Sequence, residues 1–139
     1  MTKETEQKLM ETAIEYREKS YSPYSGFMVG AAVVTKTGEI FGGCNVENAS
    51  YSVTNCAERT AIFKAVSEGF REFEAIAIVG AKKGERLEFC PPCGVCRQVM
   101  TEFCDPNEFK VLLGTSSKDY KPYLLRDLLP FGFTPKNLE

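Results

Sequence analysis

Three cysteines, Cys56, Cys93 and Cys96, constrain the fold of this chain more than any other feature of its sequence. Cys93 and Cys96 are three residues apart, so on a helix their side chains project from the same face of one turn. Cys56 belongs to another segment, and only the tertiary fold can bring its sulfur to the other two. Three thiolates can hold one zinc ion and leave one tetrahedral position open, which is typical of catalytic zinc sites. The spacing therefore predicts a fold that closes around one zinc ion per chain.

Both cysteine groups are predicted to lie at helix N-termini. Cys56 follows Asn55, which can start a helix, and Cys93 and Cys96 follow Pro92. Unpaired backbone N–H groups and the positive end of the helix dipole stabilise thiolates at such positions. The local sequence therefore suits each cysteine to bind a metal as a thiolate.

Glu58 and Arg59 stand beside the first of the predicted ligands. Glu58 is two residues from Cys56, so its carboxylate can take up a proton released by a zinc-bound water. Arg59 is three residues from Cys56 and can reduce the negative charge that three thiolates place around zinc. Two structural alternatives stay open, because Glu58 could be the acid of a capping box behind an Asn55 N-cap and Arg59 could be a solvated charge. Beside the cysteines, we favour the catalytic interpretation of Glu58.

The remaining cysteines allow two other kinds of metal site. Cys90, Cys93 and Cys96, with Cys104 following, are similar to an iron–sulfur ligand run, although seven residues separate the last two where three are typical. Alternatively, Cys90 or Cys104 could complete a structural zinc site with four thiolates. We interpret Cys44, Cys90 and Cys104 as packing or bystander thiols, since a free cysteine behaves mostly as a small buried hydrophobe.

Length and charge exclude several classes of protein. With 139 residues the chain is predicted to form a single domain over residues 1–139. Its net charge of −2 argues against nucleic acid or an anionic membrane as partner and favours a small-molecule substrate. No apolar run approaches the length of a membrane span, and the polar start does not resemble a signal peptide. We expect a cytoplasmic protein, where six cysteines indicate metal binding or catalysis rather than disulfides.

Helix and strand patterns alternate along the chain after an initial pair of strands. An amphipathic helix opens the chain, two β-rich segments follow around a tight turn, and helical and strand segments then alternate up to a mixed tail. This order predicts a three-layer α/β/α sandwich with a mixed sheet. The expected helices end near residue 19 and span 55–69 and 91–103, and the expected strands are 29–35, 40–45, 75–79 and 109–113. The tail, 123–138, is expected to hold a short strand or turn, a helical turn at 126–129 and a final piece after Pro130.

Longer motifs surround the predicted ligands and cover nearly the whole chain. They are Ser22-Pro23-Tyr24-Ser25 with Phe27 and residues 29–32, then residues 43–51, residues 56–61, residues 92–98, and Leu128-Leu129-Pro130 with Phe133. Zinc deaminases of nucleobases share H-x-E and P-C-x-x-C elements, and a three-cysteine variant of the set exists. Together the motifs closely resemble the small, homotetrameric, three-cysteine type of cytidine deaminase.

The resemblance implies a cytidine deaminase-like fold with about five strands, one Zn²⁺ per chain bound by Cys56, Cys93 and Cys96, and a homotetramer. The implied reaction is hydrolytic deamination of cytidine and 2′-deoxycytidine to uridine and 2′-deoxyuridine, in pyrimidine salvage. A zinc-bound hydroxide would attack C4 of the base. Glu58 would take the proton of the water and deliver protons to N3 and to the departing ammonia, and Arg59 would support the thiolates.

The resemblance also implies that Asn45 and Glu47 hold the ribose. The two residues stand two apart at the end of an expected strand, so their side chains share one face and offer both a donor and an acceptor to sugar hydroxyls. From the residues alone, a solvated strand end is the simpler explanation. The run from Asn45 to Asn48 is more selective for free nucleosides than the cysteine motifs are.

Four further residues are expected at the substrate from the resemblance. Phe27 would pack on the ligand, although from sequence alone a core residue is the simpler interpretation. The backbone N–H of Ala57 would meet the pyrimidine carbonyl. Tyr51 and Phe133 would reach into the active site of a neighbouring subunit, so that each site would be completed by other chains.

The departures from the family pattern are small, and two related activities remain as alternatives. Cys90 and Pro91 precede the second ligand pair, and residues 131–132 stand where the family varies. A deaminase of an antibiotic nucleoside such as blasticidin S shares the zinc motifs, but the run from Asn45 to Asn48 favours cytidine. A polynucleotide-editing deaminase fits less well, since the chain is short and acidic and lacks a basic groove for a strand.

Overall fold

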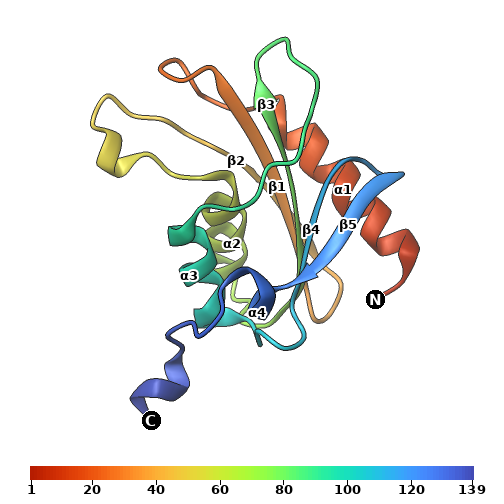
Figure 1. Cartoon of the computed structure of the whole chain (residues 1–139), viewed down its shortest axis with the longest axis vertical. Coiled ribbons are helices and arrows are strands. Elements are labelled where there is room, and N and C mark those ends of the chain that lie inside the picture. The colour runs from red at the N-terminus through yellow and green to blue at the C-terminus, as the bar shows by residue number, and fades with distance from the viewer.

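The computed structural model describes all 139 residues and contains one five-stranded sheet (Figure 1). The strand order is β2-β1-β3-β4-β5. β3 and β4 pair in parallel, whereas the other neighbouring strands pair antiparallel. This confirms the mixed sheet of about five strands. The strands are β1 Phe27–Thr35, β2 Ile40–Cys44, β3 Phe73–Lys82, β4 Lys110–Ser116 and β5 Asp119–Leu124.

Helices cover both faces of the sheet and complete the predicted three-layer α/β/α sandwich (Figure 1). α1 (Lys3–Arg17) packs on one face, and α2 (Ala57–Ser67) and α3 (Gly94–Phe103) pack on the other. Each of the three predicted helices is therefore present. No helix has both the length and the apolar character that a bilayer crossing requires.

Alternate residues of the central strands belong to two separate cores. In β1, Ala31 and Val33 pack under α2 and α3, whereas Ala32 and Val34 pack under α1. Successive side chains of a strand point to opposite faces, so a strand covered on both sides is apolar throughout. The same pattern in β3 explains why residues 75–79 form a continuous apolar run.

The C-terminal part differs from the prediction in its first half. β5 begins at Asp119, before the expected start of the tail at residue 123, and forms a hairpin with β4. The helical turn expected at residues 126–129 is α4, Leu125–Leu128. Beyond it Phe131 has a φ of 56° and is fully exposed, the Phe133 carbonyl is hydrogen-bonded to α3, and the chain ends in the 3-10 helix η2, Pro135–Leu138.

Candidate active site

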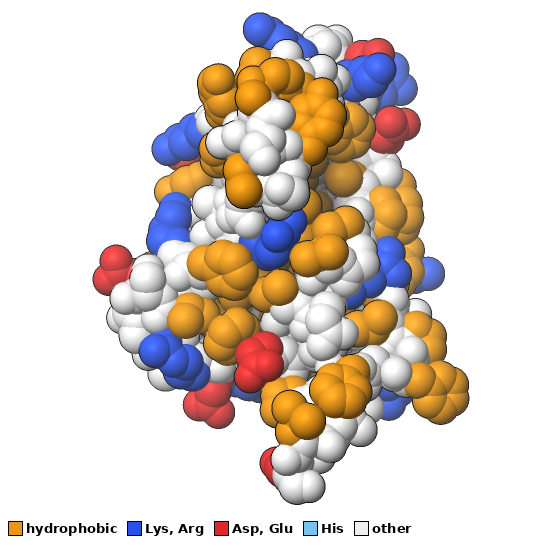
Figure 2. Space-filling model, turned by 90° about the vertical axis from the view of Figure 1, so that its left-hand side faces the viewer, with side chains coloured by type: hydrophobic (Ala, Val, Ile, Leu, Met, Phe, Trp, Pro, Cys, Tyr) orange, Lys and Arg blue, Asp and Glu red, His pale blue; other side chains and the backbone are white.

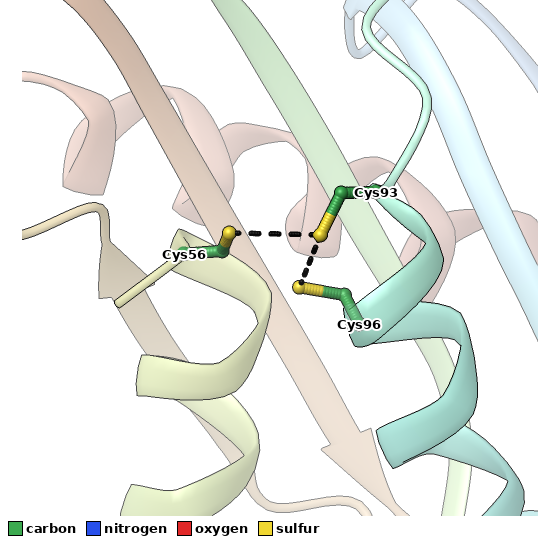
Figure 3. A group of neighbouring side chains, drawn as sticks. All are labelled: Cys56, Cys93 and Cys96. Atoms are coloured by element: carbon green, nitrogen blue, oxygen red, sulfur yellow. Dashed lines mark hydrogen bonds between the residues drawn. The ribbon is translucent and has the colours of Figure 1, made fainter. Parts of the chain in front are cut away.

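The three predicted ligands meet where α2 and α3 begin (Figure 3). Cys56 is the N-cap of α2, Cys93 is the N-cap of α3, and Cys96 lies in the first turn of α3. The sulfur of Cys93 lies 3.8 Å from that of Cys56 and 3.5 Å from that of Cys96. Zinc–sulfur bonds of about 2.3 Å in a tetrahedron place neighbouring sulfurs about 3.8 Å apart. The donor set therefore fits one zinc ion with a fourth position open.

A close approach of α2 to the sheet places Cys56 at this point. Gly43 of β2 has no side chain, and a Cβ there would lie 2.5 Å from the Ala61 nitrogen and 2.9 Å from the Ala57 carbonyl oxygen. Any larger residue at position 43 would push the start of α2 away from the sheet. The glycine thus allows the close approach that positions Cys56.

Glu58 points into the same site and is almost completely buried, with 4% of its surface exposed. Burial raises the pKa of its carboxyl group to about 7. The capping-box alternative is wrong, because the helix begins at Ala57 with Cys56 as its N-cap, and Asn55 instead donates to Thr60 Oγ1 at 3.0 Å. The carboxyl group of Glu58 is therefore available to a ligand.

Arg59 faces the cysteines and not the solvent. Its Nη2 donates to Cys56 Sγ at 3.3 Å, and its Nε is buried without an acceptor. The alternative of a solvated charge is therefore wrong. A guanidinium in this position offsets part of the negative charge of three thiolates, as partners of metal ligands commonly do.

The other three cysteines lie outside the sulfur cluster. Cys90 is half-buried, and burial raises the pKa of its thiol to about 11. Cys104, the C-cap of α3, is buried, and burial raises the pKa of its thiol as well. Cys44 donates to the Lys19 carbonyl at 3.3 Å. Neither the iron–sulfur alternative nor a fourth thiolate ligand has support in this geometry.

A cavity of about 220 Å³ adjoins the sulfur cluster. The N–H of Ala57, the first residue of α2, has no partner within the helix and is available to a ligand. The residues predicted at the substrate base line this cavity, together with four residues that were not predicted there, namely Val29, Thr54, Cys90 and Pro91. Its lining residues are Phe27, Val29, Asn45, Thr54, Cys56, Ala57, Glu58, Cys90, Pro91 and Cys93.

A second hollow of about 320 Å³ is lined by Tyr24, Ser25, Glu47, Tyr51 and Thr54. Thr54 lines both spaces, so the hollow adjoins the cavity of the cysteines. The two residues expected at the sugar are divided between these spaces: Glu47 lines the hollow, and Asn45, two residues earlier in the chain, lines the cavity.

Asn45 also holds the start of β1 in place. Its Nδ2 donates to the Phe27 carbonyl at 2.8 Å, and its Oδ1 accepts from the Val29 N–H at 2.9 Å and from the Ser20 hydroxyl. These hydrogen bonds hold the backbone of Phe27 in place at the edge of the cavity. The simple interpretation of Asn45 as a solvated strand end is wrong, because the residue is buried.

Tyr51 and Phe133 are not brought to the cysteine cavity within one chain. Tyr51, in the 3-10 helix η1 (Tyr51–Val53), is 74% exposed and packs edge-on against Tyr24. Phe133 is 57% exposed on the tail, where its carbonyl accepts from Gln98 Nε2 at 2.8 Å.

Arg97 is a supporting residue that was not predicted from the sequence. Its Nε donates to the Pro92 carbonyl at 2.8 Å, directly before Cys93, and its Nη1 donates to the Leu128 carbonyl at 2.6 Å. Arg97 thus links the segment before Cys93 to the C-terminal part of the chain. The available signal was an arginine immediately after the last ligand, Cys96.

Known proteins share both this sequence and this fold. The family model described as the cytidine and deoxycytidylate deaminase zinc-binding region matches residues 3–112. A protein of Halalkalibacterium halodurans named cytidine deaminase is 50% identical over 132 residues, which are 95% of this chain and 96% of that protein. The crystal structure of cytidine deaminase from Burkholderia pseudomallei superimposes with a TM-score of 0.82 at 49% identity, over 96% of this chain and 100% of that one. A blasticidin-S deaminase of Bacillus cereus is 36% identical over 110 residues, or 76% of each chain.

Proposed function

This chain belongs to the cytidine and deoxycytidylate deaminase zinc-binding family, and we propose that it converts cytidine and 2′-deoxycytidine to uridine and 2′-deoxyuridine by hydrolysis. The observation that carries the proposal is the cluster of three sulfurs with buried Glu58 in the adjoining cavity. Zinc-binding thiolates must stay reduced, which suits the cytoplasm, and the proposed products, uridine and 2′-deoxyuridine, suit a role in pyrimidine salvage.

Cys56, Cys93 and Cys96 would hold the zinc ion, and Arg59 would support the first of them. Bound zinc supplies the Lewis acidity that makes a water molecule acidic near neutral pH. Glu58 would take the proton of that water, deliver it to N3 of the base and pass a further proton to the amino group that leaves as ammonia. Its burial beside the cysteines keeps the carboxyl group away from bulk water during these transfers.

The two adjoining spaces fit a base linked to a sugar. In the cysteine cavity, Phe27 would pack on the pyrimidine and the free Ala57 N–H would donate to its carbonyl oxygen. Asn45 and Glu47, at the passage to the second hollow, would hold the sugar. A free base would leave these polar groups without partners, so we expect nucleosides to be preferred.

Ammonia release from metal-replete protein tests this assignment with four compounds. Cytidine and deoxycytidine should be turned over, whereas cytosine, which lacks the sugar, should be a poor substrate. Blasticidin S is included because a blasticidin-S deaminase is among the similar proteins. Efficient turnover of cytosine would contradict the roles of Asn45 and Glu47. Turnover of blasticidin S alone would move the protein to that activity.

The proposal includes a homotetramer in which Tyr51 and Phe133 contribute to neighbouring active sites. Both rings are largely exposed in the single chain, as are Phe131 and Leu138. Figure 2 shows apolar side chains gathered on one face of the molecule and on the projecting C-terminal tail at its bottom. Large exposed apolar patches often mark an interaction surface.

Deletion of residues 129–139 should weaken assembly and abolish turnover while zinc stays bound. The deletion removes Phe133 but keeps Leu128, whose carbonyl accepts from Arg97 beside the metal site. Size-exclusion chromatography, metal analysis and ammonia release would follow the three properties. Phe133→Ala is a finer variant that keeps the chain length. A truncated protein that is monomeric and fully active would contradict both the tetramer and the shared site.

A further inference from the structure

Ser25 connects the two sides of the proposed substrate site. Its backbone N–H donates to Glu47 Oε1 at 3.1 Å, and its hydroxyl donates to Glu47 Oε2. The same hydroxyl oxygen accepts from the Phe27 N–H at 2.9 Å. Ser25 therefore links the carboxylate of Glu47, which is proposed to bind the sugar, to the backbone of Phe27, whose ring is proposed to pack on the base.

The carboxylate of Glu47 has little hydrogen-bonding capacity left. An ionised carboxylate accepts at about four positions, two on each oxygen. Oε1 already accepts from the N–H groups of Tyr24, at 2.9 Å, and of Ser25. Oε2 accepts from the Ser25 hydroxyl, so one acceptor position remains, on Oε2. These hydrogen bonds hold the pKa of Glu47 below its usual value, and the bond from the Ser25 hydroxyl has the largest effect. The carboxylate therefore stays an acceptor at neutral pH.

The surroundings of Glu47 indicate which kind of donor can bind to the remaining acceptor position on Oε2. Glu47 lines the hollow next to the cysteine cavity, with Thr54 common to both. A substrate with its base at the cysteines would therefore place its sugar near Glu47. A sugar hydroxyl is a single neutral donor, and it matches the single acceptor position that is left.

We propose that Ser25 is a positioning residue, whose hydroxyl directs the free acceptor of Glu47 toward a sugar hydroxyl. Without that hydroxyl, Oε2 loses the bond that orients it, and the Phe27 N–H loses its acceptor. Substrates that carry the sugar hydroxyl then bind more weakly, while the chemistry at the metal is little affected. The inference rests on the proposed function, because it assumes a nucleoside substrate.

The test compares Ser25→Ala and Ser25→Thr with the wild type on cytidine and on 2′,3′-dideoxycytidine, which lacks both ring hydroxyls. Where dideoxycytidine reacts too slowly, its inhibition constant against cytidine is measured. We expect Ser25→Ala to lower kcat/KM for cytidine about tenfold, mainly through KM, as for loss of one hydrogen bond to a charged group. Dideoxycytidine should be affected far less, and Ser25→Thr, which keeps the hydroxyl, should recover most of the loss.

A double-mutant cycle separates this role from a general effect on the loop. In a Glu47→Gln background, Ser25→Ala should add little further loss for cytidine, since the two residues act together. Equal losses for both substrates, no loss for either, or a full additional loss in the Glu47→Gln background would overturn the inference. Zinc content and thermal unfolding check that each variant is folded. If the wild type releases no ammonia from cytidine, the proposed function itself has failed.

Discussion

A Glu58→Gln variant should keep its fold and one zinc ion per chain, while kcat for cytidine falls by several orders of magnitude. Glu58 is almost fully buried in the cavity that also contains Cys56 and Cys93. Proton transfer by a positioned side chain is worth about 10²–10⁴-fold, and the proposed reaction uses Glu58 for more than one transfer. Because glutamine has nearly the same shape as glutamate, packing should change little. It cannot carry the proton, so the loss should fall on kcat.

Metal analysis, thermal unfolding and ammonia release would measure the three expected properties of this variant. The matched control is Glu68→Gln, which makes the same chemical change at the exposed C-cap of α2 and should leave kcat as in the wild type. A Glu58→Gln enzyme with a tenth or more of the wild-type rate would mean that Glu58 does not carry the proton.

Replacing Cys93 by Ala should remove both the zinc ion and the activity. The sulfur of Cys93 lies 3.8 Å and 3.5 Å from those of Cys56 and Cys96, so it is the shared neighbour in the cluster. With two thiolates left, the site has too few protein ligands for a stable zinc centre. Since bound metal also stabilises the folded state, the melting temperature should fall with the metal content. Metal analysis of the purified protein, before and after added zinc, would show the loss.

Cys90→Ala and Cys104→Ala are the controls for this experiment, because neither sulfur belongs to the cluster. Both variants should retain one zinc ion per chain, and the wild-type protein should be colourless. Zinc lost from the Cys90 variant would show that a ligand is misassigned. Iron together with visible absorbance in the wild type would instead support the iron–sulfur alternative.

The layers of the fold could be predicted from the sequence because they follow from local patterns, and the three cysteines of the cluster because their motifs match those of zinc deaminases. Apolar residues at the period of a helix or strand predicted α1 to α3 and β1 to β4, and each lies within a few residues of its predicted bounds. The spacing of Cys93 and Cys96 predicted that they share one helix turn, and they do. Arg59, three residues from Cys56, likewise reaches the sulfur by the geometry of one turn.

β5 was predicted only as a short strand or turn at the start of the tail, because its sequence pattern is weak. Pro122 lies in the middle of this strand, opposite Leu112 of β4. Proline cannot donate to a neighbouring strand and argues against a central strand, but an edge position tolerates it. β5 is the last strand in the order of the sheet, which only the assembled sheet reveals.

The sequence by itself therefore determined the secondary structure around the site and indicated the three cysteines of the cluster, of which only the pair Cys93 and Cys96 is set by short-range geometry. Only the tertiary structure decided which side chains meet across long stretches of chain. It brought Ser25 to Glu47 and Arg97 to Leu128, and it left Phe133 outside the cavity of its own chain. These contacts depend on how loops and the tail pack on the finished sheet, and no periodicity within one segment encodes the distance between two of them.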